Sequence, residues 1–276
     1  MTPSPPEKVV HLNRYYHFTE LMRDPGIEGR LQRYQAQHDA TTQSVLVLKP
    51  TQKESDKIFF FFHGMDGDCG DAVVVRDLVT RVGATVVAMG GRGPAWLSTP
   101  FLADAQQVIR RYSQGFLGFY LIGISMGATQ VLSLAGLMAD DLRASVLGVV
   151  ALMPGTNLPA IYERSANDRV KNTVLNSVGG DLSLLQARSP AHVMYHYKGG
   201  LPFVIFCREQ DSLLLADEMT PFMTRLRENN HPVAAYLVAG EHDFTYENFD
   251  YQTAVEKLGT HSTEHNPPLR VRLNKT

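Results

Sequence analysis

Apolar runs of strand length recur along the chain and alternate with segments whose apolar residues follow helical spacing. Six of these runs are apolar almost throughout: residues 57–62, 84–89, 119–124, 146–153, 201–207 and 233–238. A strand with one face in solvent alternates apolar with polar residues, so continuous apolar runs indicate strands covered on both faces. The pattern therefore predicts an α/β fold, in which a mostly parallel sheet carries helices on both faces.

The predicted helices lie between these runs. Residues 101–114, FLADAQQVIRRYSQ, show helical spacing clearly, with apolar side chains at Phe101, Ala105, Val108 and Ile109. The other predicted helices are 72–83, 126–142, 216–230 and 248–259.

Two regions depart from the alternation. Residues 30–39 and 44–50 predict two strands that form an antiparallel hairpin ahead of the first apolar run. Residues 155–198, after the sixth predicted strand, are far longer than an ordinary connection and carry enough apolar residues to fold as short helices. We expect this segment to be a cap-like helical insertion, a lid or cap that leaves the sheet and returns to it at one edge.

The expected domain organisation follows from these boundaries. It comprises an N-terminal arm (1–30), one α/β domain (31–258) that contains the insertion, and a C-terminal tail (259–276).

Composition and charge narrow the classes of partner. The chain has 44% hydrophobic and 20% charged residues, as ordinary globular proteins do. Its formal net charge of −2 gives no field that would attract nucleic acid or an anionic membrane. No apolar run approaches the roughly 18 residues that span a bilayer. The start, MTPSPPEKVV, lacks the basic and long apolar regions of a secretory signal, so we expect a cytoplasmic protein. The sequence leaves the oligomeric state open.

The sequence lacks the common motifs for cofactor and metal binding. The GGRG at 90–93 lacks the pattern of a dinucleotide-binding loop, and no Gly-x-x-x-x-Gly-Lys motif occurs. No closely spaced set of Cys and His has the spacing of metal ligands. Cys69 and Cys207 lie in or beside predicted strands, which favours reduced, structural thiols over a disulfide framework. We therefore expect neither a cofactor nor a metal.

One strand–helix junction carries a motif with chemical meaning. Residues 123–127 read Gly-Ile-Ser-Met-Gly, a G-x-S-x-G at the point where an apolar strand gives way to a predicted helix. A turn this sharp strains the residue at its centre, and small neighbours avoid clashes with strand and helix. It presents the hydroxyl of Ser125 above the sheet edge at a helix N-terminus, where the helix dipole favours developing negative charge. Ser125 is the candidate nucleophile.

A serine nucleophile needs a base, usually a histidine oriented by a carboxylate. Among ten histidines, His242 alone follows a late apolar strand, in GEHDF. Asp211 ends the strand before it, at the same predicted sheet edge, and is our candidate for the orienting acid. Asp243 is a rival, but side chains adjacent in sequence rarely face each other well enough for a hydrogen bond to Nδ1. Glu209 and Glu241 are weaker rivals.

The G-x-S-x-G turn and the chain order serine, acid, histidine resemble the α/β-hydrolase family. The resemblance covers roughly residues 31–258 and implies the α/β-hydrolase fold. It also implies an oxyanion hole made of two backbone N–H groups. One belongs to the residue after the His-Gly turn of KIFFFFHGMDG, here Met65, and the other to the residue after the nucleophile, here Met126.

The same resemblance assigns other residues of that turn. His63 becomes a structural residue instead of a base, and Gly64 and Gly67 allow the backbone to approach the substrate. The segment GGRGPAWLS resembles the Arg-Gly-containing loop that many family members carry after the next strand. Its Trp96, the only tryptophan, is expected either to line a substrate pocket or to be a packing residue.

The insertion supplies the remaining candidates for substrate binding. We expect Ile161, Tyr162 and Leu185 to form part of an acyl-pocket wall that excludes water from the oxyanion hole. The alternative is a helical segment packed beside the sheet with no role in binding.

The resulting function is a serine hydrolase that cleaves a carboxylic ester of a small-molecule acyl substrate through an acyl-enzyme intermediate. A thioesterase, an acyltransferase or a small peptidase would use the same groups. The run from SPAHVMYHYKGGLPFVIF to GEHDF is similar to the catalytic domain of the prolyl oligopeptidase group. A non-catalytic binding protein with this fold is the alternative from another class, because fold alone does not imply activity.

Overall fold

The computed structural model describes residues 18–52, 54–243, 249–259 and 269–270. Within them, nine strands form one sheet. Their spatial order is β1 (Ile27–Gln35), β2 (Thr42–Pro50), β4 (Thr85–Met89), β3 (Ile58–Phe62), β5 (Phe119–Ile124), β6 (Val146–Leu152), β7 (Phe203–Arg208), β8 (Val233–Val238) and β9 (Leu269–Arg270). β2 pairs antiparallel with β1 and β4, and every other pair is parallel. The predicted hairpin and the mostly parallel sheet are confirmed.

The phenylalanine run of β3 explains why the sheet is covered twice. Successive side chains of a strand point to opposite faces. Phe60 and Phe62 accordingly pack into one apolar core and Phe59 and Phe61 into the other, all of them buried. A strand of this composition is stable only between two helical layers.

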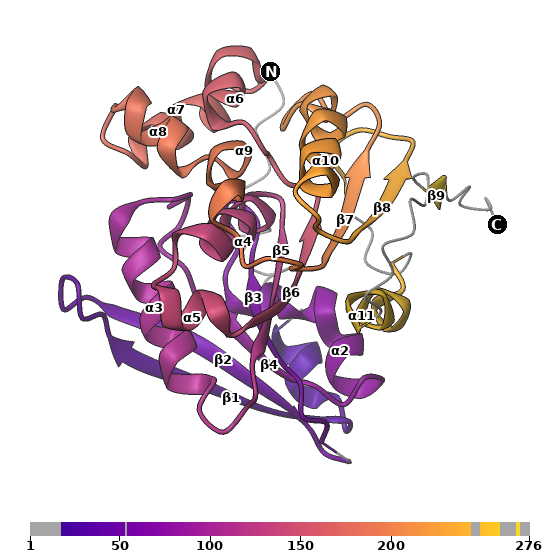
Figure 1. The fold of residues 1–276 in the computed structure, drawn as a ribbon. Coiled ribbons are helices and arrows are strands. Elements are labelled where there is room, and N and C mark those ends of the chain that lie inside the picture. Colours follow the sequence, from indigo (N-terminus) through magenta and orange to yellow (C-terminus); the bar gives the residue numbers. More distant parts are fainter. Residues whose placement is uncertain (1–17, 53, 244–248, 260–268, 271–276) are drawn as a thin grey trace, which may run out of the picture.

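The helices form those two layers. On one face lie α3 (Thr99–Tyr112), α4 (Met126–Leu137), α5 (Asp140–Ala144) and α10 (Met219–Glu228). On the other lie a 3₁₀ helix at Cys69–Val75, α2 (Arg76–Thr80) and α11 (Tyr251–Gly259). The pair α2 and α11 is seen on the side of the sheet away from α3 and α5 (Figure 1).

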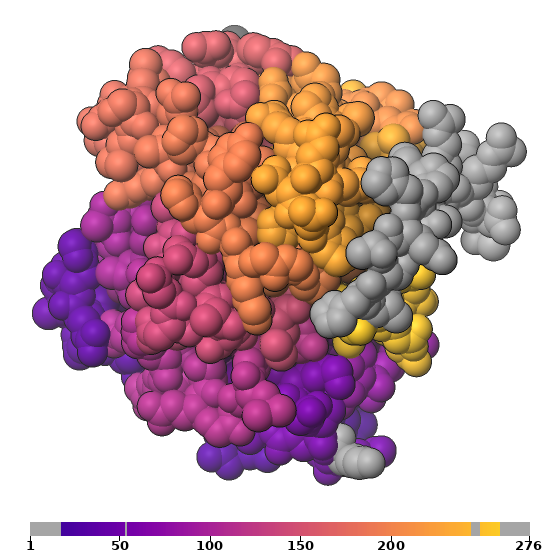
Figure 2. Space-filling view, in the orientation of Figure 1, coloured from indigo at the N-terminus to yellow at the C-terminus, as the bar shows by residue number. Residues whose placement is uncertain are grey.

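The segment after the sixth strand is helical, as predicted. It contains α6 (Leu158–Arg164), α7 (Asp168–Asn176), α8 (Leu182–Arg188), α9 (Pro190–Val193) and a 3₁₀ turn at Met194–His196. These helices lie together at one end of the molecule, near α10 (Figure 1), and form the salmon and orange region at the top of the space-filling view (Figure 2). Ion pairs join the two groups, because Arg164 contacts both Asp217 and Glu218 just before α10.

Three predicted boundaries differ from the structure. The first strand begins before residue 30, because β1 starts at Ile27, and Leu21 of the predicted arm is completely buried in the core that holds Phe59 and Phe61. The predicted helix 126–142 is two helices, since Met138 is extended and the acidic first turn of α5 favours a new N-terminus. Two residues of the predicted C-terminal tail pair with β8 as β9.

The two cysteines are free and buried, as the strand pattern indicated. Burial raises the pKa of the Cys69 thiol to about 11 and that of Cys207 to about 12, so neither is a reactive thiolate at neutral pH.

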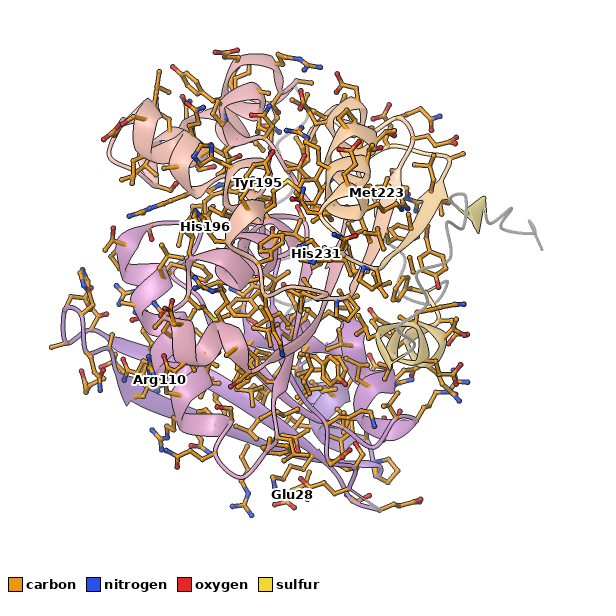
Figure 3. The ribbon with its side chains drawn as sticks, viewed as in Figure 1. Glu28, Arg110, Tyr195, His196, Met223 and His231 are labelled. Carbon is orange, nitrogen blue, oxygen red and sulfur yellow. The ribbon has the colours of Figure 1, made fainter. Side chains whose placement is uncertain are left out.

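His231 is a buried histidine at the start of β8 (Figure 3). Its Nδ1 lies 3.2 Å from the carbonyl oxygen of Leu201, and its ring packs edge-on against Tyr197 and Phe203. Burial lowers the pKa of His231 below its ordinary value, so the folded state favours the neutral ring.

We expect His231 to make the fold sensitive to mild acid. Below the ordinary histidine pKa of about 6.5, the unfolded chain takes up a proton more readily than the folded one, so this contribution to stability is present above that pH and lost as pH falls. The variant His231→Asn keeps a donor for the Leu201 carbonyl. Between pH 7.5 and 5 it should lose less free energy of unfolding than the wild-type protein does. Urea unfolding at both pH values measures this free energy. An equal loss in variant and wild type would contradict the role of His231 in acid sensitivity.

Candidate active site

Ser125 occupies a strained turn between β5 and α4. Its φ and ψ are 55° and −117°, a conformation that costs a residue other than glycine about 1–3 kcal/mol. A side chain on Gly123 would lie 2.1 Å from the carbonyl oxygen of Gly127, and one on Gly127 would lie 2.0 Å from that of Phe62. Only hydrogen fits at either position, which explains the two glycines of the motif.

The structure brings Ser125, His242 and Asp211 into one hydrogen-bonded chain. His242 Nε2 lies 2.8 Å from Ser125 Oγ, and His242 Nδ1 lies 2.6 Å from Asp211 Oδ2. The three residues come from the carboxyl ends of β5, β8 and β7, which meet at one edge of a parallel sheet. The arrangement allows the serine hydroxyl to pass its proton to the ring while the carboxylate holds the opposite N–H.

Asp211 is itself held in place from the other side. It is 6% exposed, and its Oδ1 accepts hydrogen bonds from the backbone amides of Leu213 and Leu214 at 3.0 and 2.9 Å. One carboxylate oxygen is thus fixed by backbone amides while the other faces His242. Asp243, the rival acid, has an exposed side chain whose Oδ1 lies 3.1 Å from Arg208 Nη2.

The backbone amides of Met65 and Met126 are the candidates that the resemblance assigns to an oxyanion hole. Met126 is the first residue of α4, and the first amides of a helix have no partner within it. Met65 is the second residue of a turn closed by a 3.0 Å bond from the Gly67 amide to the Gly64 carbonyl, so its own N–H takes no part in that bond. Asp66, at the third position, has a φ of 66°.

His63 is buried inside this turn and is not an available base. Its Nδ1 lies 2.7 Å from the Gly64 carbonyl oxygen. Side chains on Gly67 or Gly91 would lie 2.8 and 2.2 Å from the His63 ring nitrogens. The absence of a side chain at Gly67 therefore makes room for the His63 ring and for the Asp71 carboxylate, which would lie 2.2 Å away.

Helix α7 of the insertion contacts the turn of residues 64–67, the candidate oxyanion turn. Arg169 Nη2 lies 2.6 Å from Asp66 Oδ1. The Thr173 hydroxyl accepts a 3.0 Å bond from the Trp96 indole N–H and lies 3.5 Å from the Met65 sulfur. The sequence offered no signal for Arg169 or Thr173, because they look like ordinary polar positions of a helix.

Three of the four residues expected to bind substrate are packing residues. Trp96 is 1% exposed, and Ile161 and Leu185 are 0% exposed, so none of them offers a surface to a substrate. The backbone carbonyl of Trp96 also accepts a 2.7 Å bond from Gln130 of α4, which fixes its loop to that helix. Tyr162 is half-buried and stays a candidate.

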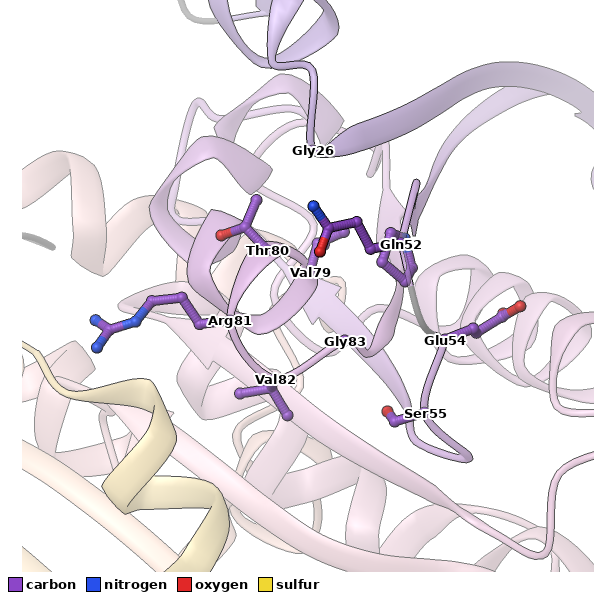
Figure 4. Close-up of a pocket in the computed structure, with 10 residues that line it drawn as sticks. Gly26, Gln52, Glu54, Ser55, Val79, Thr80, Arg81, Val82 and Gly83 are labelled. Carbon is purple, nitrogen blue, oxygen red and sulfur yellow. The ribbon is translucent and has the colours of Figure 1, made fainter.

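Other features of the described residues lie apart from this site. A hollow of about 430 Å³ lies at the opposite ends of the parallel strands, in the loops that precede β3 and β4, with Gln52, Glu54 and Arg81 in its wall (Figure 4). In the described ranges, no group of three or more His, Cys, Asp or Glu side chains is placed to hold a metal ion. No helix in those ranges is long and apolar enough to cross a bilayer.

Solved structures of esterases and of a serine hydrolase resemble most of this chain. A thermostable esterase from Pseudomonas putida ECU1011 aligns with a TM-score of 0.66 and 20% identity over 94% of this chain and 89% of that one. An arylesterase aligns with a TM-score of 0.69 and 17% identity over 93% of this chain and 89% of that one. The fluorophosphonate-binding serine hydrolase F of Staphylococcus aureus aligns with a TM-score of 0.65 and 17% identity over 84% of this chain and 97% of that one. No protein-family model matches the sequence, and no curated protein matches it significantly. The chain has the α/β-hydrolase fold.

Proposed function

We propose that the protein is a serine hydrolase that cleaves a carboxylic ester of a small-molecule substrate through an acyl-enzyme intermediate. The observation that supports it most is the hydrogen-bonded chain from Ser125 through His242 to the buried Asp211, with the serine in a strained turn at the start of α4. A structural serine has no need of a strained backbone, a histidine and a buried carboxylate together.

The proposed reaction begins with acylation. His242 Nε2 takes the proton of Ser125 Oγ as the oxygen attacks the ester carbonyl carbon. The negative charge that develops on the carbonyl oxygen is stabilised by the amides of Met65 and Met126 and by the N-terminus of α4. The ring then gives the proton to the departing alcohol oxygen, which leaves the acyl group on the serine.

Deacylation repeats these steps with water. His242 takes a proton from water as the water oxygen attacks the acyl carbon, and then returns that proton to Ser125 Oγ as the acid departs. Asp211 stays ionised throughout, holds Nδ1–H and stabilises the imidazolium. Thioester, acyl-transfer and peptide substrates use the same groups, so they are alternatives within this proposal.

Labelling with a fluorophosphonate, followed by a panel of p-nitrophenyl acyl esters of graded length, tests the proposal. Stoichiometric labelling of Ser125 together with turnover of a short ester is the expected result. Labelling without turnover of any ester would favour a thioester, acyl-transfer or peptide substrate. The absence of both would favour a binding protein with this fold.

The wall of the acyl pocket is expected at Met65 and not at the buried residues of the insertion. Ile161→Ala and Leu185→Ala should lower the free energy of unfolding by about 2–5 kcal/mol, because both side chains are completely buried. They should leave the ratio of kcat/KM between short and long esters unchanged. Met65→Ala keeps the amide but removes a half-buried side chain at the oxyanion turn, and should shift that ratio about tenfold. The reverse pattern in the ester panel would place the pocket within the insertion.

A further inference from the structure

Arg208 is a buried cation at the end of β7. It is 6% exposed, its guanidinium lies over the Phe206 ring at 5.6 Å, and it reaches the turn that follows β8. Its Nη1 donates to the carbonyl oxygen of Ala239 at 2.9 Å, and its Nε donates to that of Asp243 at 2.9 Å. A third contact, at 3.1 Å, joins Nη2 to the Asp243 carboxylate.

These acceptors lie on either side of His242. Ala239 precedes the histidine and Asp243 follows it, so one planar group joins the two ends of the turn that carries the ring. The donors of a guanidinium have a fixed spacing, so the bonds from Arg208 set the separation of those two carbonyls. A single ammonium group cannot reproduce this bridge.

Residues that follow β7 also contact the end of β8 and the same turn, but with exposed side chains or through the backbone. The Glu209 amide donates to Val238, the Gln210 amide donates to Gly240, and Ser212 Oγ lies 3.4 Å from Glu241 Oε2. Glu209, Gln210 and Ser212 are exposed, whereas Arg208 and Asp211 are buried.

The burial of Arg208 costs free energy that its hydrogen bonds must offset. A buried cation is costly unless its donors are satisfied, and this one is satisfied by the backbone of the histidine turn. The strand end thus presents two buried side chains to the turn: Asp211, which holds the ring, and Arg208, which holds the backbone that bears it.

We infer that Arg208 is a positioning residue for His242, an inference that rests on the proposed function for its kinetic consequence. Arg208 contacts neither Ser125 nor the ring. It fixes the turn so that Nε2 and Nδ1 reach Ser125 and Asp211 at the same time. A displacement of about 1 Å at a reacting group costs on the order of 100-fold in rate.

Arg208→Lys and Arg208→Met test this role. The first keeps the charge and the second fills much of the volume, so a folded variant should be available. In either variant kcat for a short ester should fall roughly 100-fold, with KM within about twofold of wild type. Guanidinium ion should restore activity to Arg208→Ala with saturation, and ammonium ion should not.

The matched control is Arg227→Lys. Arg227 of α10 donates to the carbonyl of Val233 at 3.4 Å, at the opposite end of β8 from the histidine turn. It is also partly buried, so it reports the cost of losing an arginine–backbone bond away from the site. Its kcat should stay within about twofold of wild type.

A spectroscopic measurement tests the positioning independently of activity. The ¹⁵N shifts of the His242 ring, assigned with His242→Gln, report whether the proton is held on Nδ1. Wild type should show a fixed Nδ1–H tautomer and Arg208→Lys an averaged one. Unchanged shifts in the folded variants, or wild-type kcat in either of them, would overturn the inference. If wild type neither hydrolyses esters nor reacts with fluorophosphonate, the proposed function fails while the ring shifts still decide the role of Arg208.

Discussion

Ser125→Ala should abolish ester hydrolysis and leave the fold intact. The variant removes the proposed nucleophilic oxygen, and loss of a serine nucleophile costs on the order of 10⁶ in kcat in a well-studied serine protease. The Oγ is hydrogen-bonded to His242, and Ser125 belongs to neither apolar core, so its removal should leave both cores unchanged. Hydrolysis of p-nitrophenyl acetate and circular dichroism measure the two effects.

Ser133→Ala is the matched control for this variant. Ser133 lies two turns further along α4 with a buried hydroxyl that donates to the Arg188 carbonyl at 2.7 Å. Its loss should cost about 1 kcal/mol of stability and little activity. If Ser125→Ala kept more than a few per cent of wild-type kcat, the nucleophile would have to be another residue.

Asp211→Asn should be far more damaging than Asp243→Asn. An amide at 211 can present an NH₂ group to His242 Nδ1, which stabilises the wrong tautomer, and the equivalent change costs about 10⁴ in kcat in a serine protease. Asp243 has a 73% exposed side chain and contributes one ion pair to Arg208. Solvent screens the exposed carboxylate of this pair, and Arg208 keeps its two backbone acceptors without it, so kcat should change less than about fivefold.

Steady-state kinetics of the two asparagine variants decide between the acids. Asp243→Asn keeps both bonds from Arg208 to backbone carbonyls, so the histidine turn should stay in place. A larger loss of kcat in Asp243→Asn than in Asp211→Asn would move the orienting role to Asp243.

The local turn at Ser125 was predictable because its cause is local. A G-x-S-x-G between an apolar strand and a helix restricts the backbone whatever the rest of the chain does, and the structure shows the strain and both steric contacts. Asp211 and His242 were also accessible to sequence analysis, because parallel strands place their carboxyl ends along one edge.

Predictions for the insertion and the loops were less successful. Ile161 and Leu185 were expected at the substrate and Trp96 either there or in the core, yet all three are buried. An apolar side chain in an irregular segment has the same sequence signature whether it faces a ligand or the core. The contact of α7 with the oxyanion turn joins residues about one hundred positions apart, and no local pattern encodes such a pair.

The sequence by itself determined the strands of the parallel sheet, the burial of both sheet faces, the strained turn at Ser125 and the order of the candidate residues. Each of these depends on spacing along the chain. Only the tertiary structure decided which carboxylate faces His242, which apolar residues remain accessible, and that Arg208 joins the two ends of the histidine turn. These features depend on which strand ends and helices lie side by side. Packing of the whole chain sets those distances. A hydrogen bond forms only when donor and acceptor lie about 3 Å apart, and the spacing of residues along the chain does not fix that distance.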